Sequence, residues 1–264
     1  MAASNANRQL GISTNTLSKS TEKLSSGYRI NRAADDAAGL SISEKMRSQI
    51  RGLNKASSNA QDGISAIQTA EGALNEAHSI LQRMNELATQ SANDTNTTAD
   101  RTAVQSEVNA LTNELSRIAS TSQFNTQNLL DGTFTGKKLQ VGALENQKIT
   151  ISIGTMNAKA LGVDSLDVKS FTKAGAAMTK IQKAISKVSG QRSDLGALQN
   201  RLEHTVNNLD NISENTQTAE SRIRDTDMAS EMVQYSATSI IQQAGQSMLA
   251  QANSQTQGVL SLIQ

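Results

Sequence analysis

The 264-residue chain contains no cysteine, no proline and no tryptophan, and its only other aromatic residues are three Phe and two Tyr. Without cysteine, disulfides and cysteine metal sites are excluded. Without proline, helices are not interrupted and slow cis/trans isomerisation is avoided, which suits a chain that must unfold and refold readily. Because aromatics are scarce, the core must consist of Leu, Ile, Val, Met and Ala, which favours helix seams over a compact globule.

The chain also lacks an excess of either charge and any long apolar run. Lys plus Arg number 25 and Asp plus Glu 24, a net charge of +1. This balance gives no electrostatic reason to expect binding to nucleic acid or to an anionic membrane. No apolar run reaches the roughly 18 residues of a membrane span, and residues 1–10 lack the pattern of a cleaved signal peptide. We expect no nucleic-acid partner, no membrane insertion and no export by the signal-peptide route.

The most informative feature present is an apolar seam that runs unbroken from Ala177 to Ile223. Its positions recur in alternating steps of four and three residues, and only Gln191, Thr205 and Thr216 are not apolar. A 3.5-residue repeat stays on one helix face only when the helix supercoils around a partner. These residues make a rod of roughly 70 Å, so the sequence predicts a mainly α fold built on long coiled-coil rods. The seam is Ala177, Ile181, Ala184, Val188, Gln191, Leu195, Leu198, Leu202, Thr205, Leu209, Ile212, Thr216, Ala219 and Ile223.

Two further helices precede this seam. Ser41 followed by Glu44 is typical of a capping box and predicts a helix start at Ser41. That helix continues through heptads at residues 67–88 and is broken by the polar stretch 91–98. A third helix carries apolar residues between positions 104 and 118.

One segment has a different period. Residues 148–153 alternate apolar and polar side chains, and residues 139–141 can pair with them across the turn 142–147. This pattern predicts one small β-hairpin at about residues 138–154.

Both chain ends have weak helical signals. Near the start, Ala3, Leu10, Leu17 and Leu24 recur every seven residues, and after Glu231 the last 33 residues carry no charged side chain. Such a segment is marginal alone and becomes buried among helices when a partner arrives; a floppy soluble tail is the alternative. We expect the two ends to pair as an antiparallel coiled coil, residues 1–35 with 224–264, apart from a sturdier bundle of residues 36–223.

No catalytic or metal-binding constellation stands out. His78 and His204 lie beside seam positions without the spacing of a metal site. The acidic pairs Asp35–Asp36 and Asp225–Asp227 precede helices, where carboxylates act as caps. We therefore expect a protein that is not an enzyme and has no cofactor and no metal.

Several long motifs identify a family. They are LSSGYRIN at 24–31, RAADDAAGLSISE at 32–44, QTAEGAL at 68–74, QFN at 123–125, NRLE at 200–203, AESRIRDTDMASE at 219–231 and VLSLIQ at 259–264. Together these motifs resemble bacterial flagellin over nearly the whole chain. The resemblance implies a terminal coiled-coil domain that orders in the filament, a second domain of long helices with a β-hairpin, and no variable outer domains.

The resemblance also implies partners and a location. Flagellin subunits are exported unfolded by the flagellar export apparatus with a chaperone, and they assemble outside the cell beneath a cap protein and next to junction proteins. The expected function is thus that of a secreted structural subunit of the bacterial flagellum, a homopolymer. The residues expected to carry polymerisation are Leu10, Leu17, Leu24, Ile240, Ile241, Ala244, Met248, Val259 and Leu262.

Residues 81–90 resemble the helix surface by which many flagellins engage the flagellin-sensing Toll-like receptor. Carried over by position, the contacts would be Arg83, Leu87 and Gln90, with Glu107 from the next helix. The alternative is that these residues lie on a face used in filament packing, and both roles can hold because a face buried in the filament is exposed in the monomer. Two alternatives to a filament subunit also remain, a hook–filament junction protein and a receptor-binding form that does not polymerise.

Removing residues 232–264 is expected to abolish filament growth, because this charge-free segment needs neighbouring helices for burial. After filament seeds are added, electron microscopy should show filaments from the full chain and none from the truncated chain. Filaments of normal length from the truncated chain would contradict this expectation.

Overall fold

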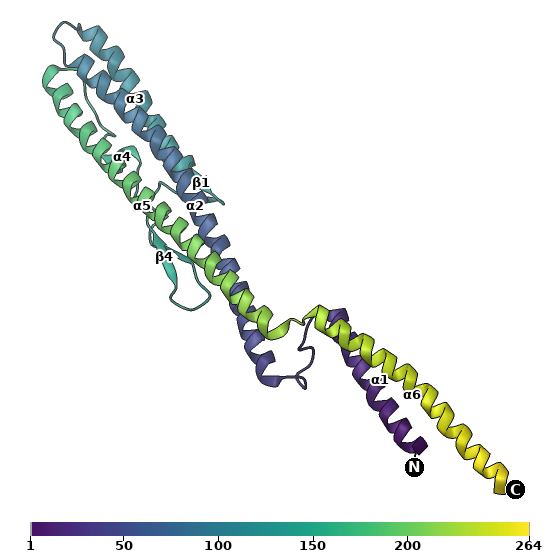
Figure 1. Ribbon diagram of the computed structural model, residues 1–264. Coiled ribbons are helices and arrows are strands. Elements are labelled where there is room, and N and C mark those ends of the chain that lie inside the picture. The colour runs from purple at the N-terminus through teal and green to yellow at the C-terminus, as the bar shows by residue number, and fades with distance from the viewer. Residues whose placement is uncertain (1, 264) are drawn as a thin grey trace. The chain divides into compact units, whose positions relative to one another are not determined.

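A computed structural model describes the backbone of residues 2–263 and the side chains of residues 3–255. The mainly α fold predicted from the sequence is confirmed (Figure 1). The chain divides into two compact units, a terminal unit of residues 1–50 with 214–264 and a central unit of residues 51–213. The elements are α1 (Ala2–Ser26), α2 (Ala37–Ser91), α3 (Thr98–Thr121), β1 (Gln123–Phe124), β2 (Gln127–Asn128), β3 (Lys137–Gln140), β4 (Lys148–Ile151), α4 (Ala158–Leu161), α5 (Phe171–Arg224) and α6 (Met228–Ile263).

Heptad seams of α2 and α5 form the core of the central unit. The predicted α2 positions between Ile67 and Ala88 are at most 2% exposed, and those of α5 from Ala177 to Leu202 include its most buried residues. The same core also includes residues of α3 and of the segment 129–168, so the elements that cover the two long helices share in the apolar burial. The residues of this core in α2 and α5 include Ile67, Ala70, Leu74, Ala77, Leu81, Met84, Ala88, Ala177, Ile181, Ala184, Val188, Leu195 and Leu202.

The predicted seam is wrong at one position. Ile212 is 39% exposed, whereas Ser213 is 8% exposed and its hydroxyl donates to Asn54 Oδ1 at 2.7 Å. An α-helix drifts by about 20° per heptad against a 3.5-residue repeat. After several heptads this drift brings the next residue to the interface, where the serine hydroxyl finds a partner.

The predicted hairpin is present as the antiparallel pair β3–β4, in which Leu139 lies opposite Ile149. It packs on α2, where a Cβ on Gly63 would collide with Leu139 Cδ1. Asn59 Nδ2 also donates to the Gln140 carbonyl at 3.1 Å. A glycine on the helix surface therefore gives the strand room to approach α2 closely.

A second antiparallel pair, β1–β2, is present that the sequence pattern does not predict. Its turn residues Asn125 and Thr126 have φ angles of 46° and 62°, the left-handed conformations of a two-residue hairpin turn. Strands of two residues are too short to produce an alternating pattern.

The segment that follows α4 is held to α3 by a buried glutamine. Gln105 Nε2 donates to the Leu166 carbonyl and its Oε1 accepts from the Val168 amide, both at 2.8 Å. Gln191 plays a similar part on α5, where its Oε1 accepts from Gly154 N at 3.2 Å. These side chains satisfy backbone groups that no regular element pairs.

In the terminal unit the two connectors pair with each other. Tyr28 and Asp225 form an isolated antiparallel bridge, and the Arg224 guanidinium lies 4.6 Å from the centre of the Tyr28 ring. Thr226 N donates to the Gly27 carbonyl at 3.0 Å. Backbone pairing and a cation–π contact thus join the end of α1 to the start of α6.

The predicted start of α2 at Ser41 is wrong, because the helix begins at Ala37. Asp36 supplies the cap, with its Oδ1 accepting from Gly39 N at 2.8 Å. Glu44 instead forms an ion pair with Arg224, whose Nη1 lies 3.2 Å from Glu44 Oε1. The capping role of the aspartates is confirmed for Asp36 and for Asp227, whose Oδ1 accepts from Ala229 N at 3.0 Å ahead of α6.

Replacing Gln105 with alanine is expected to destabilise the central unit by about 2 kcal/mol, since it strands a buried amide and a buried carbonyl. Urea unfolding followed by circular dichroism measures the change. Gln68→Ala, at an exposed position of α2, is the matched control and should shift stability by less than about 0.5 kcal/mol. Equal stability of the two variants would contradict this role of Gln105.

Candidate assembly surface

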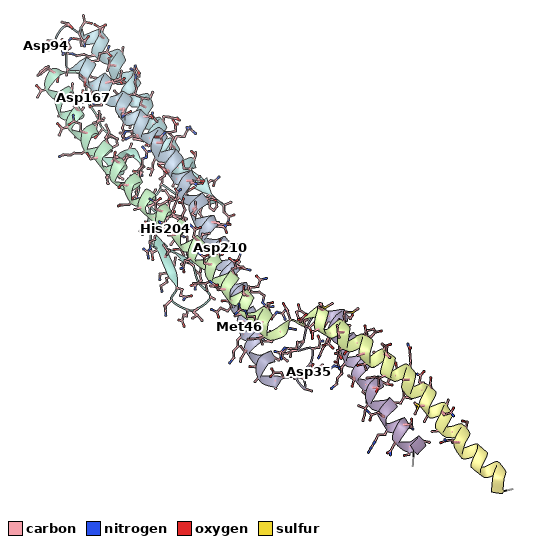
Figure 2. All side chains as sticks on the ribbon, in the orientation of Figure 1. Asp35, Met46, Asp94, Asp167, His204 and Asp210 are labelled. Carbon is pink, nitrogen blue, oxygen red and sulfur yellow. The ribbon has the colours of Figure 1, made fainter. Side chains whose placement is uncertain are left out.

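Helices α1 and α6 lie side by side and run antiparallel (Figure 1). Their contacts follow that order, since Lys23 Nζ lies 3.5 Å from Glu231 Oε2 and Gln242 Nε2 donates to Thr14 Oγ1 at 3.3 Å. Further along, an added Cβ on Gly245 would lie 3.5 Å from Leu10 Cδ1. Figure 2 shows the side chains along both helices.

The seam between these helices is built from small and polar side chains. Ser13, Ser20 and Thr238 are its most buried members, at 7%, 2% and 6% exposure. Thr238 satisfies its hydroxyl inside the helix by donating to the Gln234 carbonyl at 2.8 Å. Leu10, Leu17 and Leu24 are only half-buried there. Little apolar area is removed from water, so the pair is weakly stabilised.

Large apolar side chains of α6 remain exposed although α1 lies beside it. Ile240 is 67% exposed, Val233 71% and Met248 66%. A surface helix normally turns its apolar stripe towards the core. A contiguous apolar surface of this kind marks an interaction site.

Part of this surface is hollowed. A groove of about 300 Å³ runs between the two helices, and its lining is Ala6, Gln9, Leu10, Ser13, Ile241, Ala244, Gly245 and Met248. We call the groove together with the exposed Ile240 and Val233 the outer apolar face.

The residues predicted to carry polymerisation thus fall into two groups. Leu10, Leu17 and Leu24 contribute to the seam, whereas Ile240, Ile241, Ala244 and Met248 are exposed. The side chains of Val259 and Leu262 lie outside the described residues. The role of all nine in polymerisation stays a prediction.

The residues predicted to contact a receptor lie on α2 and α3. Arg83 joins the two helices, with its Nη2 donating to Glu107 Oε1 at 2.9 Å and its Nη1 to Glu86 Oε2 at 3.2 Å. These hydrogen bonds, chiefly that to Glu107, raise the pKa of Arg83 above its usual value. Gln90 is exposed. Leu87 is 2% exposed and belongs to the core, and its role in receptor binding, like that of Arg83, Gln90 and Glu107, stays a prediction.

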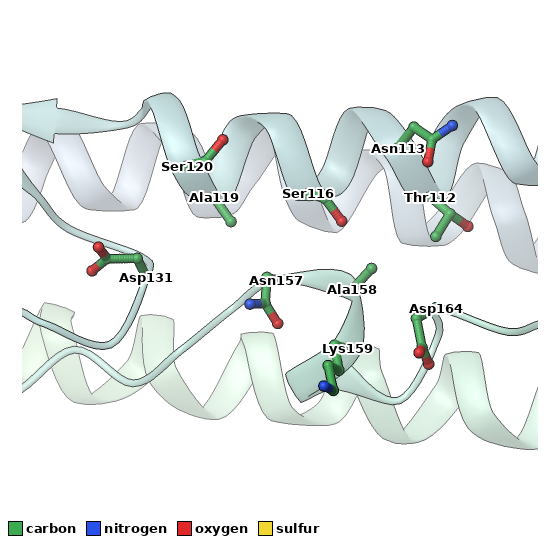
Figure 3. A pocket seen from close by; sticks show the side chains of 10 residues that line it. All are labelled: Thr112, Asn113, Ser116, Ala119, Ser120, Asp131, Asn157, Ala158, Lys159 and Asp164. Atoms are coloured by element: carbon green, nitrogen blue, oxygen red, sulfur yellow. The ribbon is translucent and has the colours of Figure 1, made fainter.

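A hollow of about 420 Å³ in the central unit lies between α3 and α4 and is lined mostly by polar residues (Figure 3). Its lining includes Thr112, Ser116 and Asn157, with Asp131 at one end and Asp164 at the other. Asp131 is already engaged, because hydrogen bonds from Thr133, its largest stabilising contact, lower its pKa. The two histidines considered from the sequence lie outside this hollow, His78 half-buried on α2 and His204 exposed on α5.

The long heptad seams and the outer apolar face define a helical structural protein. Residues 1–135 match the bacterial flagellin N-terminal helical region, and residues 178–263 match the bacterial flagellin C-terminal helical region. The chain belongs to the bacterial flagellin family. Within residues 2–263, none of its helices has the length and apolarity needed to cross a bilayer.

Curated relatives match along their whole length. The chain is 56% identical over 265 residues to a flagellin of Halalkalibacterium halodurans, covering 100% of this chain and 97% of the relative. It is 50% identical over 279 residues to the flagellar filament 33 kDa core protein of Treponema phagedenis, covering 100% and 98%. The crystal structure of Bacillus cereus flagellin is 32% identical, with a TM-score of 0.52 over 58% of this chain and 88% of that chain.

Proposed function

We propose that the chain is the structural subunit of a bacterial flagellar filament, which it forms outside the cell with copies of itself. The observation that carries this proposal is the outer apolar face of α1 and α6. Ile240 and Met248 lie more than 60% exposed on a helix whose residues after Glu231 carry no charge. Such a face is stable only when other chains cover it, so folding of the terminal unit and assembly are coupled.

The remaining partners follow from the same proposal. A subunit that folds fully only in the polymer travels through the export apparatus unfolded, with a chaperone holding its ends. In the filament it then meets cap and junction proteins. A junction protein would share the terminal helices without extending indefinitely, and seeded growth of long filaments distinguishes the two.

A second function has its own support, recognition of the monomer by the flagellin-sensing Toll-like receptor. Arg83 and Glu107 form an exposed ion pair across α2 and α3, and Gln90 lies exposed one helical turn beyond Leu87. An exposed arginine held in place by two carboxylates is a typical anchor of protein interfaces. Since Leu87 is buried, it contributes to this surface by packing beneath the exposed residues and not by direct contact with the receptor.

Replacing Ile240 with glutamine should raise the lowest concentration that sustains seeded growth by about tenfold or more. The reason is that an isoleucine contributes about 1.5–3 kcal/mol when fully buried, and 1.4 kcal/mol corresponds to a factor of ten. Sedimentation of filaments at equilibrium measures this concentration. Leu144→Gln is the matched control, because Leu144 is 68% exposed against 67% for Ile240 but lies in the hairpin turn. Equal behaviour of both variants would count against the outer apolar face.

Arg83→Ala should weaken activation of receptor-bearing reporter cells by about tenfold, as expected when an interface arginine is truncated. Arg117→Ala removes another exposed arginine that is paired with a glutamate on α3, and it should change the response by less than about twofold. Matching dose–response curves for the two variants would exclude Arg83 as a receptor contact. The assay uses monomer freshly separated from filaments.

A further inference from the structure

Charge in the central unit is segregated between two stretches of sequence. Residues 137–192 contain ten Lys or Arg and three acidic residues, whereas residues 62–114 contain eight acidic residues and two Arg. Because the net charge of the whole chain is only +1, positive and negative side chains are separated along the sequence without a large excess of either sign. A surface divided in this way attracts its own complement on another molecule.

The positive side includes a regular stripe on α5. Lys173, Lys180 and Lys187 follow one another at seven-residue intervals and are exposed. Lys187 Nζ donates to the Ala160 carbonyl at 2.8 Å, and Lys173 Nζ lies 2.6 Å from Asp167 Oδ2. The stripe therefore runs beside the segment 158–168. Among residues 3–255, Lys180 has no ion-pair partner. We call these three residues the basic stripe.

The negative side includes a stripe of the same period on α3. Asp100, Glu107 and Glu114 are also seven residues apart, the first two exposed and the third half-exposed. Glu107 accepts from Arg83 of α2, so this stripe runs along the α2 side of α3 and away from the segment 158–168. Its existing ion pairs are solvent-exposed and weak, so they can be exchanged for others. We call these three residues the acidic stripe.

The two stripes match in spacing and in direction. Seven residues of helix rise by about 10.5 Å, so both stripes place a charge at the same interval. Figure 1 shows α3 and α5 starting from the same end of the central unit and running the same way. Gln105, early in α3, binds Leu166 and Val168 shortly before α5 begins. A second copy of equal polarity can therefore oppose Asp100 to Lys173, Glu107 to Lys180 and Glu114 to Lys187.

We propose that the basic stripe of one subunit binds the acidic stripe of a second copy of this chain, side by side and with the same polarity. The inference rests on the proposed filament function and names one of its interfaces. Because the stripes lie on different faces of the unit, the contact is heterologous. It leaves a free stripe of each sign for the next subunit, as extended growth requires.

The test is a charge exchange in the full chain. Lys180→Glu with Lys187→Glu reverses two of the three charges of the basic stripe, and Glu107→Lys with Glu114→Lys reverses two of the three charges of the acidic stripe. Each double variant should raise the lowest concentration for polymerisation by about tenfold or more, which corresponds to about 1.4 kcal/mol of lost attraction. The quadruple variant carries both exchanged stripes and should polymerise with itself to within about threefold of the original chain. Mixing the two double variants in equal amounts should also restore assembly.

The control is Lys138→Glu with Lys148→Glu, which makes the same change in net charge as the double lysine variant but places it on the hairpin. It should polymerise normally, and circular dichroism should show all variants equally helical. If either double variant polymerises like the control, or if the quadruple variant stays as poor as its parents, the inference is overturned. If the unchanged chain itself fails to polymerise from seeds, the filament proposal fails instead, so the two failures are distinguishable.

Discussion

The position of the apolar residues on α1 and α6 is the constraint on which the rest depends. The two helices meet through Ser13, Ser20 and Thr238, while Ile240 and Val233 remain 67% and 71% exposed. A helix pair usually gains its stability by burying the larger side chains between its members. In α1 and α6, much of the apolar surface that could be buried lies outside the contact between the two helices, so its burial requires another surface. The terminal unit is therefore incomplete as an isolated structure, and the filament proposal identifies what completes it.

The central unit solves the opposite problem. Its seams close on themselves, with Leu74, Leu81 and Ile181 fully buried. Irregular segments are fastened by polar side chains, as Gln105 fastens the segment before α5. This unit needs no second chain to bury its core, so its surface is free to carry charge. In the proposed contact the basic and acidic stripes use that surface, and complementary charges contribute more to the specificity of an interface than to its affinity.

The sequence predicts the features that depend on periodicity and fails where single contacts decide. Heptads reveal the seams of α2 and α5, and alternation reveals β3–β4, because regular burial imposes a regular pattern. Ser41 and Glu44 fit a capping box and predict a helix start at Ser41. Instead, Asp36 caps a helix that begins four residues earlier, at Ala37, and Glu44 binds Arg224. Gln105 gave no signal, since a buried glutamine looks like any surface glutamine until its two backbone partners are known.

The same distinction explains the candidate surfaces. The absence of charge after Glu231 already indicates burial by a partner, but it does not tell which apolar residues face the partner and which face α1. Leu87 is a similar case, because the heptads of α2 alone do not show that it belongs to the core of the central unit. The basic and acidic stripes become meaningful only when α3 and α5 are seen to run in the same direction. The sequence shows that charged residues recur every seven positions. Which side of the helical bundle those residues occupy is known only when the packing of α2, α3 and α5 is known.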